Sequence, residues 1–182
     1  MKYALPTLIV LCVGIGLLVT YQRNTARTIQ PEPAKLLTPT VQSQAARAVP
    51  AGYREYRSDR YRFSLLYPDS LSVSEYEEGG GATTVTFQNA EQAQGFQIFI
   101  APFAAPQITE EQFKKDNPSG VRDDLQDITI DGALAASFYS TSGLLGETAE
   151  IWIVHGGFLY EATTLKLLAP WLSDIMNTWK FL

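Results

Sequence analysis

Alternation between apolar and polar residues is the feature of this sequence that most restricts its fold. Tyr61, Phe63 and Leu65 alternate with the polar residues Arg62 and Ser64. Successive side chains of a β-strand point to opposite faces, so this pattern is typical of strands with one buried face. Similar alternation, or short β-branched and aromatic runs between turn signals, predicts further strands at 71–74, 83–87, 96–100, 128–130, 133–139, 149–154 and 158–165.

One of these strands is apolar on both faces. Ile151–Val154 contains no polar residue, so both of its faces must be covered, which places it inside a sheet with layers above and below. Gly156 and Gly157 follow, and two glycines suit the positive φ angles of a two-residue hairpin turn. We therefore expect an antiparallel sheet in which the strands at 149–154 and 158–165 are neighbours.

Two helices are expected to cover this sheet. Thr109–Gln112 has the spacing of a capping box, and the short helix that it opens carries Phe113 as its apolar residue. A second helix is expected to start at Pro170, since proline is favoured in a first helical turn. Its apolar stripe falls at i, i+3, i+4 and i+7: Leu172, Ile175, Met176 and Trp179. Many strands with few helices predict an α+β sandwich.

The N-terminal segment is of a different kind. Tyr3–Tyr21 contains no charged residue, and Leu5–Val19 is almost wholly aliphatic. As a helix of 19 residues it would be about 28 Å long, close to the thickness of a bilayer core. A retained transmembrane anchor and a cleaved signal peptide both fit. Because Thr20–Arg23 lacks the small residues of a cleavage site, the retained anchor is favoured. Cys12 is expected to be a small apolar residue of that helix.

A linker is expected between this segment and the globular domain. Residues 22–52 are rich in Gln, Thr, Ala and Pro and contain too few large apolar residues to form a core. Residues 1–21 are thus the anchor or signal segment, 22–52 the linker and 53–182 the domain. Of the charges, 1–52 hold five basic residues and one acidic residue, whereas 53–182 hold nine basic and 18 acidic residues. A domain this acidic is repelled by phosphate backbones, so nucleic-acid binding is not expected.

Arginines are concentrated at the start of the domain. Arg54, Arg57, Arg60 and Arg62 are four of its nine basic residues. They would form a positive patch if they shared one face. We expect them instead to pair with Glu55, Asp59 and other carboxylates as solvated strand and turn residues.

Histidine and cysteine are too scarce for most catalytic sites. His155 is the only histidine and Cys12 the only cysteine, so a Cys/His zinc site lacks ligands. A nucleophile–histidine–acid triad would have to use His155. This residue directly precedes the glycine pair, which predicts an exposed turn position.

The acidic residues have structural explanations. Asp127–Gly132 is superficially similar to a calcium loop, but Phe138 occupies the twelfth position, where a bidentate Glu is needed. Together with Asp123 and Asp124 it is expected to form a solvated loop, strand and turn. Glu77–Glu78 adjoins a glycine turn, and Glu110–Glu111 opens a helix, where acids suit the dipole. The sequence therefore predicts no catalytic, cofactor-binding or metal-binding residue, and no enzyme.

Several short motifs resemble those of PsbP-like domains. Tyr61–Pro68 with Leu71 and Val73 resembles the family's opening strand and turn, and Ile130–Gly132 with Ala135 and Ala136 resembles its mid-domain turn. Gly157–Glu161 is similar to its late strand, and the closing helix occupies the corresponding place. Two departures stand out: Leu71 replaces the usual Trp, and Trp179–Phe181 replaces the common Ser-Phe ending.

This resemblance implies an α/β/α sandwich around a central antiparallel sheet, usually located outside the cytoplasmic membrane or in the thylakoid lumen. The plant member helps photosystem II to retain calcium and chloride, but none of its binding residues can be matched here, so that role is not carried over. The charges around the anchor do not fix its orientation, because Lys2 flanks one end and Arg23 and Arg27 flank the other. The extracytoplasmic location of the domain follows from the signal-like N-terminus and the resemblance.

The function expected from these features is that of a non-enzymatic domain docking on a protein or envelope complex. The protein would be a single-pass protein of the cell membrane, held there by Leu5–Val19, with its C-terminal domain outside the cytoplasm. The alternative is a carrier of a small molecule or lipid. For that role some of the plentiful aromatic residues, which otherwise explain the core, would line a pocket: Phe96, Phe99, Phe103, Phe138, Tyr139, Trp152, Phe158, Tyr160, Trp171 and Trp179.

Overall fold

The computed structural model describes residues 47–116, 121–142 and 145–182. Residues 48–182 form one compact unit. The expected anchor at 1–21 and nearly all of the expected linker at 22–52 lie outside the described residues. Within the described ranges, no helix is long and apolar enough to cross a membrane.

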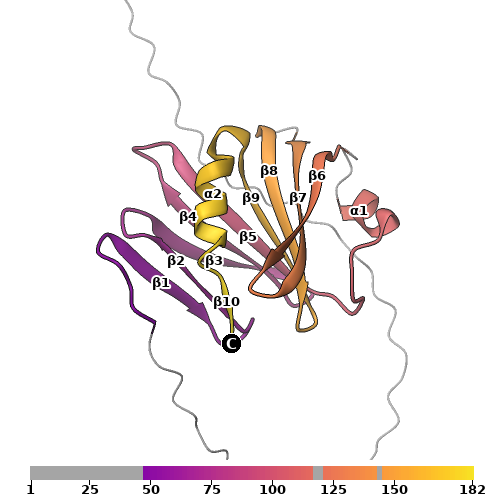
Figure 1. Cartoon of the computed structure of the whole chain (residues 1–182), viewed down its shortest axis with the longest axis horizontal. Coiled ribbons are helices and arrows are strands. Elements are labelled where there is room, and N and C mark those ends of the chain that lie inside the picture. Colours follow the sequence, from indigo (N-terminus) through magenta and orange to yellow (C-terminus); the bar gives the residue numbers. More distant parts are fainter. Residues whose placement is uncertain (1–46, 117–120, 143–144) are drawn as a thin grey trace, which may run out of the picture. The chain divides into compact units, whose positions relative to one another are not determined.

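The main sheet has seven antiparallel strands in the order β3-β4-β5-β9-β8-β7-β6 (Figure 1). Strands β3 to β5 form one run of hairpins and β6 to β9 another, and β9 joins the two runs by pairing with β5. The bounds are β3 Ser72–Gly79, β4 Ala82–Asn89, β5 Gln94–Pro102, β6 Asp123–Ile130, β7 Ala133–Ser142, β8 Gly146–His155 and β9 Phe158–Leu165.

A second, smaller sheet has the order β1-β2-β10. Its central strand is β2, Phe63–Pro68, flanked by β1, Tyr53–Ser58, and by the two-residue β10, Lys180–Phe181. The sequence predicted β2 but neither of its neighbours. Tyr61, expected at the start of the strand, lies in the turn before it and is nevertheless buried.

The main core lies between the two sheets. Phe63 and Leu65 of β2 are fully buried against alternate residues of the main sheet, among them Phe87, Ile98 and Ile153. Each of these strands sends every second side chain to this face, which is the alternation seen in the sequence. Burial of a side chain of this size contributes about 1.5–3 kcal/mol to the free energy of unfolding.

The helix α2, Ala169–Met176, covers the same face beside the small sheet (Figure 1). A 3-10 turn, η1, Lys166–Leu168, leads into it. The helix ends earlier than the apolar stripe predicted, so Trp179 lies beyond it. The Thr178 hydroxyl donates to the Ile175 carbonyl at 2.6 Å and accepts from the Leu66 amide at 2.8 Å. Those bonds turn the chain toward β10. Trp179 is still buried, and its ring stacks on Phe63 with 4.1 Å between centroids.

The opposite face of the main sheet is covered in part by α1, Glu110–Asp116. As the capping box predicted, the Thr109 hydroxyl accepts a hydrogen bond from the Gln112 amide at 3.1 Å. Phe113 then packs on Trp152 and Phe138 in a second buried cluster. Ile151 and Ile153 face the main core, whereas Trp152 and Val154 face this cluster. The prediction that both faces of this strand are covered is confirmed.

The predicted central antiparallel sheet is therefore confirmed. Its outer layers are less helical than an α/β/α sandwich implies. One layer combines the small sheet with α2, and α1 alone is the helix on the other side.

Candidate functional site

The α1 groove is an open hollow between α1 and the β6–β8 part of the main sheet. It has a volume of about 300 Å³, and Phe113, Phe138 and Trp152 form its apolar floor. Phe113 meets Phe138 edge-on with 5.4 Å between ring centroids. The Arg122 guanidinium lies 4.3 Å from the centre of the Phe113 ring and pairs with Glu110. The groove is thus shaped by rigid aromatic packing.

Two large apolar side chains of this groove are exposed. Leu134 of β7 is 74% exposed and Leu125 of β6 is 46% exposed, and both line the groove. Single exposed leucines are ordinary on protein surfaces. Here the two leucines add exposed apolar surface beside the aromatic floor of the groove. The sequence did not single out either residue.

A second open hollow lies on the opposite face of the sheet, beside the first residues of α2. This α2 hollow has a volume of about 320 Å³, and Asp124, Gln126 and Ile128 of β6 line it together with Pro170. Leu125 and Asp127 of the same strand line the α1 groove instead. Side chains of β6 therefore alternate between the two hollows, as the period of a strand requires.

The strand β6 is an exposed edge of the main sheet (Figure 1). It pairs with β7 alone, and six of its eight residues are exposed. Asp131 and Gly132, both at positive φ, form the two-residue turn after β6, so Ile130 and Ala133 are the hydrogen-bonded pair that closes the hairpin. Starting from that pair, every second residue of β6 is hydrogen-bonded to β7. Asp127 and Thr129 are the residues in between, so their backbone N–H and C=O groups point away from β7.

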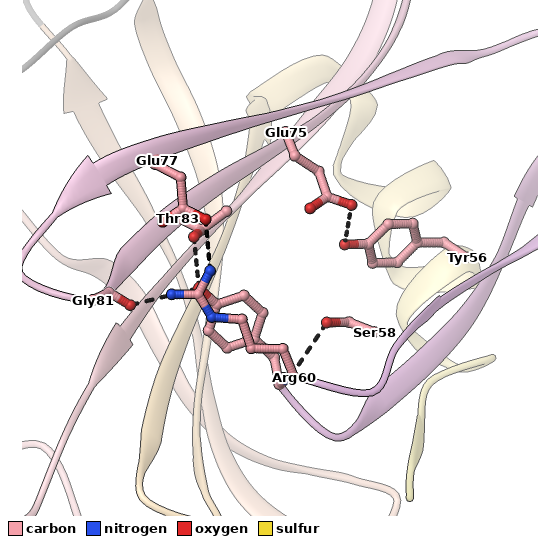
Figure 2. Close-up of polar contacts among 8 residues, drawn as sticks. Tyr56, Ser58, Arg60, Glu75, Glu77, Gly81 and Thr83 are labelled. Carbon is pink, nitrogen blue, oxygen red and sulfur yellow. Dashed lines mark hydrogen bonds and ion pairs between the residues drawn. The ribbon is translucent and has the colours of Figure 1, made fainter.

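The other edge of the main sheet, β3, is engaged by the β1–β2 hairpin. Figure 2 shows side chains from that hairpin reaching β3 and β4. The Tyr56 hydroxyl donates to the Glu75 carboxylate at 3.0 Å, and Arg60 pairs with Glu77 at 2.5 Å. The hydroxyls of Tyr61 and Thr83 lie 2.5 Å apart. Burial and the Glu75 carboxylate together raise the pKa of the Tyr56 hydroxyl.

These contacts also decide how the arginines are used. Arg57 pairs with Asp59 at 2.9 Å, and Arg62 donates to the Leu182 carbonyl at 2.6 Å. With Arg60 on Glu77, three of the four arginines bond to acceptors within the domain, as expected of solvated strand and turn residues.

The acidic side chains of β6 are not engaged in this way. The carboxylates of Asp124 and Asp127 make no hydrogen bond or ion pair with the side chains that the structure describes. The charge of Asp123 acts on Lys166, where it adds to the larger effect of Glu147 in raising the pKa of the ammonium group. Asp131, grouped with them in the sequence, is different. It accepts hydrogen bonds from the Lys180 ammonium at 2.6 Å and the Phe181 amide at 2.9 Å. These bonds hold the pKa of the Asp131 carboxyl below its usual range.

His155 lies on the surface at the end of β8, as the glycine turn predicted. Its ring stacks on Phe181 with 3.8 Å between centroids, and in the described part of the chain no Ser or Thr hydroxyl is hydrogen-bonded to it. A catalytic role would need His155 in a cleft beside a Ser, Thr or carboxylate. His155 is exposed instead, and its charge is the smallest of the causes that lower the pKa of the nearby Asp131 carboxyl.

The sequence also gave no signal for Glu150, a buried carboxyl in the middle of β8. It is 8% exposed, and the hydroxyls of Thr148 and Thr163 donate to its two oxygens at 2.7 and 2.6 Å. Burial raises the pKa of Glu150, and the hydroxyls offset this only in part. Since Thr163 lies on the neighbouring strand, these bonds tie β8 to β9.

Comparison with known proteins supports the fold expected from the motifs. No family model and no curated protein matches the chain. Solved structures that resemble it include the solution structure of cyanobacterial PsbP (CyanoP) from Synechocystis sp. PCC 6803, with a TM-score of 0.55 and 10% sequence identity. The match covers 78% of this chain and 99% of that one. The domain has a PsbP-like fold. At this identity the likeness concerns the fold alone.

Proposed function

We propose that this chain is a membrane-tethered, non-enzymatic accessory protein whose domain docks on another protein through the α1 groove. The observation that carries the proposal is the pair of exposed leucines, Leu134 and Leu125, on a groove with an aromatic floor. An apolar side chain from a partner would cover them. Apolar anchors in well-packed pockets are the residues that contribute most to protein–protein affinity.

The tether is supported by the sequence. The uncharged run Tyr3–Tyr21 is long enough to span a bilayer, and the Pro-rich residues 22–52 would hold the domain away from it. With the anchor retained, the domain would sit on the outer side of the cell membrane. A partner in the same membrane then meets the domain at high effective concentration, so a shallow groove is sufficient for docking.

The charges around the groove favour a basic partner surface. Asp127 and Arg122 are the charged residues that line it, and Arg122 is already paired with Glu110. Complementary charges around an apolar contact increase association rates and exclude partners of the wrong sign. The partner is therefore a protein that presents an apolar side chain flanked by Lys or Arg.

Crosslinking in intact membranes, followed by mass spectrometry, tests this proposal. Leu134→Glu removes an apolar contact and adds repulsion, and should lower recovery of the partner about tenfold or more. Leu167→Glu is the matched control, because Leu167 is 77% exposed and lies in η1, outside the residues that line the groove. A partner recovered equally with both variants, or none recovered under several growth conditions, would refute docking through this groove.

The groove volume of about 300 Å³ keeps a carrier role as a second candidate. It lies at the lower end of the range for small-molecule sites. A carrier would release a small apolar compound when the purified protein is extracted with organic solvent. Leu134→Glu would then reduce the amount of that compound and leave the crosslinking pattern unchanged.

A further inference from the structure

We propose that the docking partner contributes an extended basic segment that pairs with β6 as a further strand of the main sheet. This inference rests on the proposed function and specifies its binding mode. It follows from three properties of β6: its outward backbone groups, the two hollows beside it and its unpaired carboxylates.

The backbone of β6 offers hydrogen bonds at a free edge. Asp127 and Thr129 direct their N–H and C=O groups away from β7, and both residues are exposed. An added antiparallel strand opposite them would extend the kind of ladder that joins the other strands of the sheet. Strand addition of this kind takes its affinity from main-chain bonds and its specificity from pockets for alternate side chains.

Such pockets exist on both sides of this edge. Leu125 and Asp127 point to the α1 groove, whereas Asp124, Gln126 and Ile128 point to the α2 hollow. A strand beside β6 has the same period of two, so its own side chains alternate between the same two faces. One set would meet Leu125 and Leu134 of the groove, and the other would meet Ile128. Apolar residues at every second position of the added strand would therefore be buried in one of the two hollows.

Charge selects the sign of this segment. Asp123, Asp124 and Asp127 carry three carboxylates on the free edge; Asp123 acts on Lys166, and Asp124 and Asp127 have no ion-pair partner among the side chains described. Acidic residues and the bulge between Asp123 and Gln126 are also how proteins prevent two copies of an edge from pairing. Both effects act together here: the edge repels another β6, and it attracts a segment rich in Lys or Arg.

The β3 edge is less suited to this role. Its Glu75 and Glu77 side chains already bond to Tyr56 and Arg60, so their charges are compensated within the domain. In addition, Figure 2 shows side chains of the β1–β2 hairpin reaching β3. The comparison gives the experiment an internal control, because added protection is expected at β6 and not at β3.

Hydrogen–deuterium exchange of the full chain in detergent, with synthetic peptides as probes, tests the inference. The first probe is a peptide of about ten residues that alternates Lys and Leu, the length of an ordinary strand. On its addition, the exchange rates of the Asp127 and Thr129 amides should fall about tenfold or more, and those of the β3 amides should stay unchanged. A peptide alternating Glu and Leu, and the Lys–Leu peptide N-methylated at every second residue, should give no protection.

Thr129→Pro tests the same backbone group in the protein. Proline is tolerated on an edge strand where the N–H faces solvent, so the domain should fold. The variant should lose peptide protection and membrane crosslinking about tenfold, while Thr129→Val, which keeps the N–H, should retain both. The exchange measurement on the unmodified chain stands even if the proline variant does not fold.

The outcomes separate this inference from the proposed function. If crosslinking is lost in Leu134→Glu but Thr129→Pro binds normally and the two amides stay unprotected, docking holds and strand addition is refuted. If the N-methylated peptide protects as well as the basic one, strand addition is refuted. If the acidic peptide does so, the preference for a basic segment is refuted. Protection that grows with protein concentration alone would identify a second copy of this chain as the occupant and overturn the inference.

Discussion

Replacement of Asp131 by Asn tests how the C-terminal strand is held. Asp131 lies in the turn between β6 and β7 at a φ of 45°, and its carboxylate accepts hydrogen bonds from Lys180 and from the Phe181 amide. β10 has only two residues, both paired with β2. The carboxylate therefore joins the small sheet to the main sheet, beside the stacking of Phe181 on His155.

The magnitude follows from what Asn keeps and what it loses. Asn adopts positive φ as readily as Asp, and Asn-Gly is a favoured pair for this turn, so the backbone is not strained. The amide oxygen can still accept the Phe181 bond, whereas the negative charge is lost. Hydrogen bonds to a charged group contribute about 1.5–3 kcal/mol, and the half-exposed Lys180 requires a discount for solvent. We expect Asp131→Asn to lower the free energy of unfolding by about 1 kcal/mol at pH 7.

The pH dependence has a definite sign. The pKa of Asp131 is lower in the folded protein than its usual value, so its contribution to stability is fully present above about pH 4 and is lost as the pH falls through the folded pKa. The wild-type and Asp131→Asn proteins should differ at pH 7 and converge in strong acid.

Urea unfolding followed by tryptophan fluorescence measures this difference, since all three tryptophans belong to the described domain. Asp131→Ala is the companion variant. It should lose about 1 kcal/mol more than Asp131→Asn, because Ala adopts a positive φ less readily. Equal stability of Asp131→Asn and wild type at pH 7, or a difference that stays constant down to strong acid, would refute the reasoning.

Two further predictions concern buried groups. Trp179 is 1% exposed and stacks on Phe63, so Trp179→Ala should lower the free energy of unfolding by about 3–5 kcal/mol in urea titrations. Trp171 is only half-buried, so Trp171→Ala should lower the free energy of unfolding clearly less. Equal losses of stability in the two variants would contradict this packing. Burial raises the pKa of Glu150, so ionisation opposes folding and wild-type stability should fall as the pH rises above about 4.3. The stability of Glu150→Gln relative to wild type should therefore increase from pH 4 to pH 7, and a difference independent of pH would contradict the shift.

The predicted strands were confirmed where burial on one face dictates the sequence. Phe96, Ile98 and Ile100 are buried at every second position of β5, and this is what the alternation indicated. β1 gave no such pattern, because only its Tyr56 packs against the core while the rest of the strand is solvated. Its place is fixed by pairing with β2, a long-range interaction that no local pattern records. β10 is too short for any period.

The candidate site could not be predicted from the sequence, because it too depends on long-range interactions. Glu77 and Asp127 are both acidic residues of strands, and nothing local distinguishes them. The tertiary structure does: Arg60 of the β1–β2 hairpin compensates Glu77 of β3, whereas β6 lies at the free edge with the Asp127 carboxylate unpaired among the residues described. An acidic edge that is compensated stabilises the domain itself, whereas the one left open is where we propose that a basic segment of a partner pairs. On this proposal the same composition has two roles, and the tertiary structure assigns them.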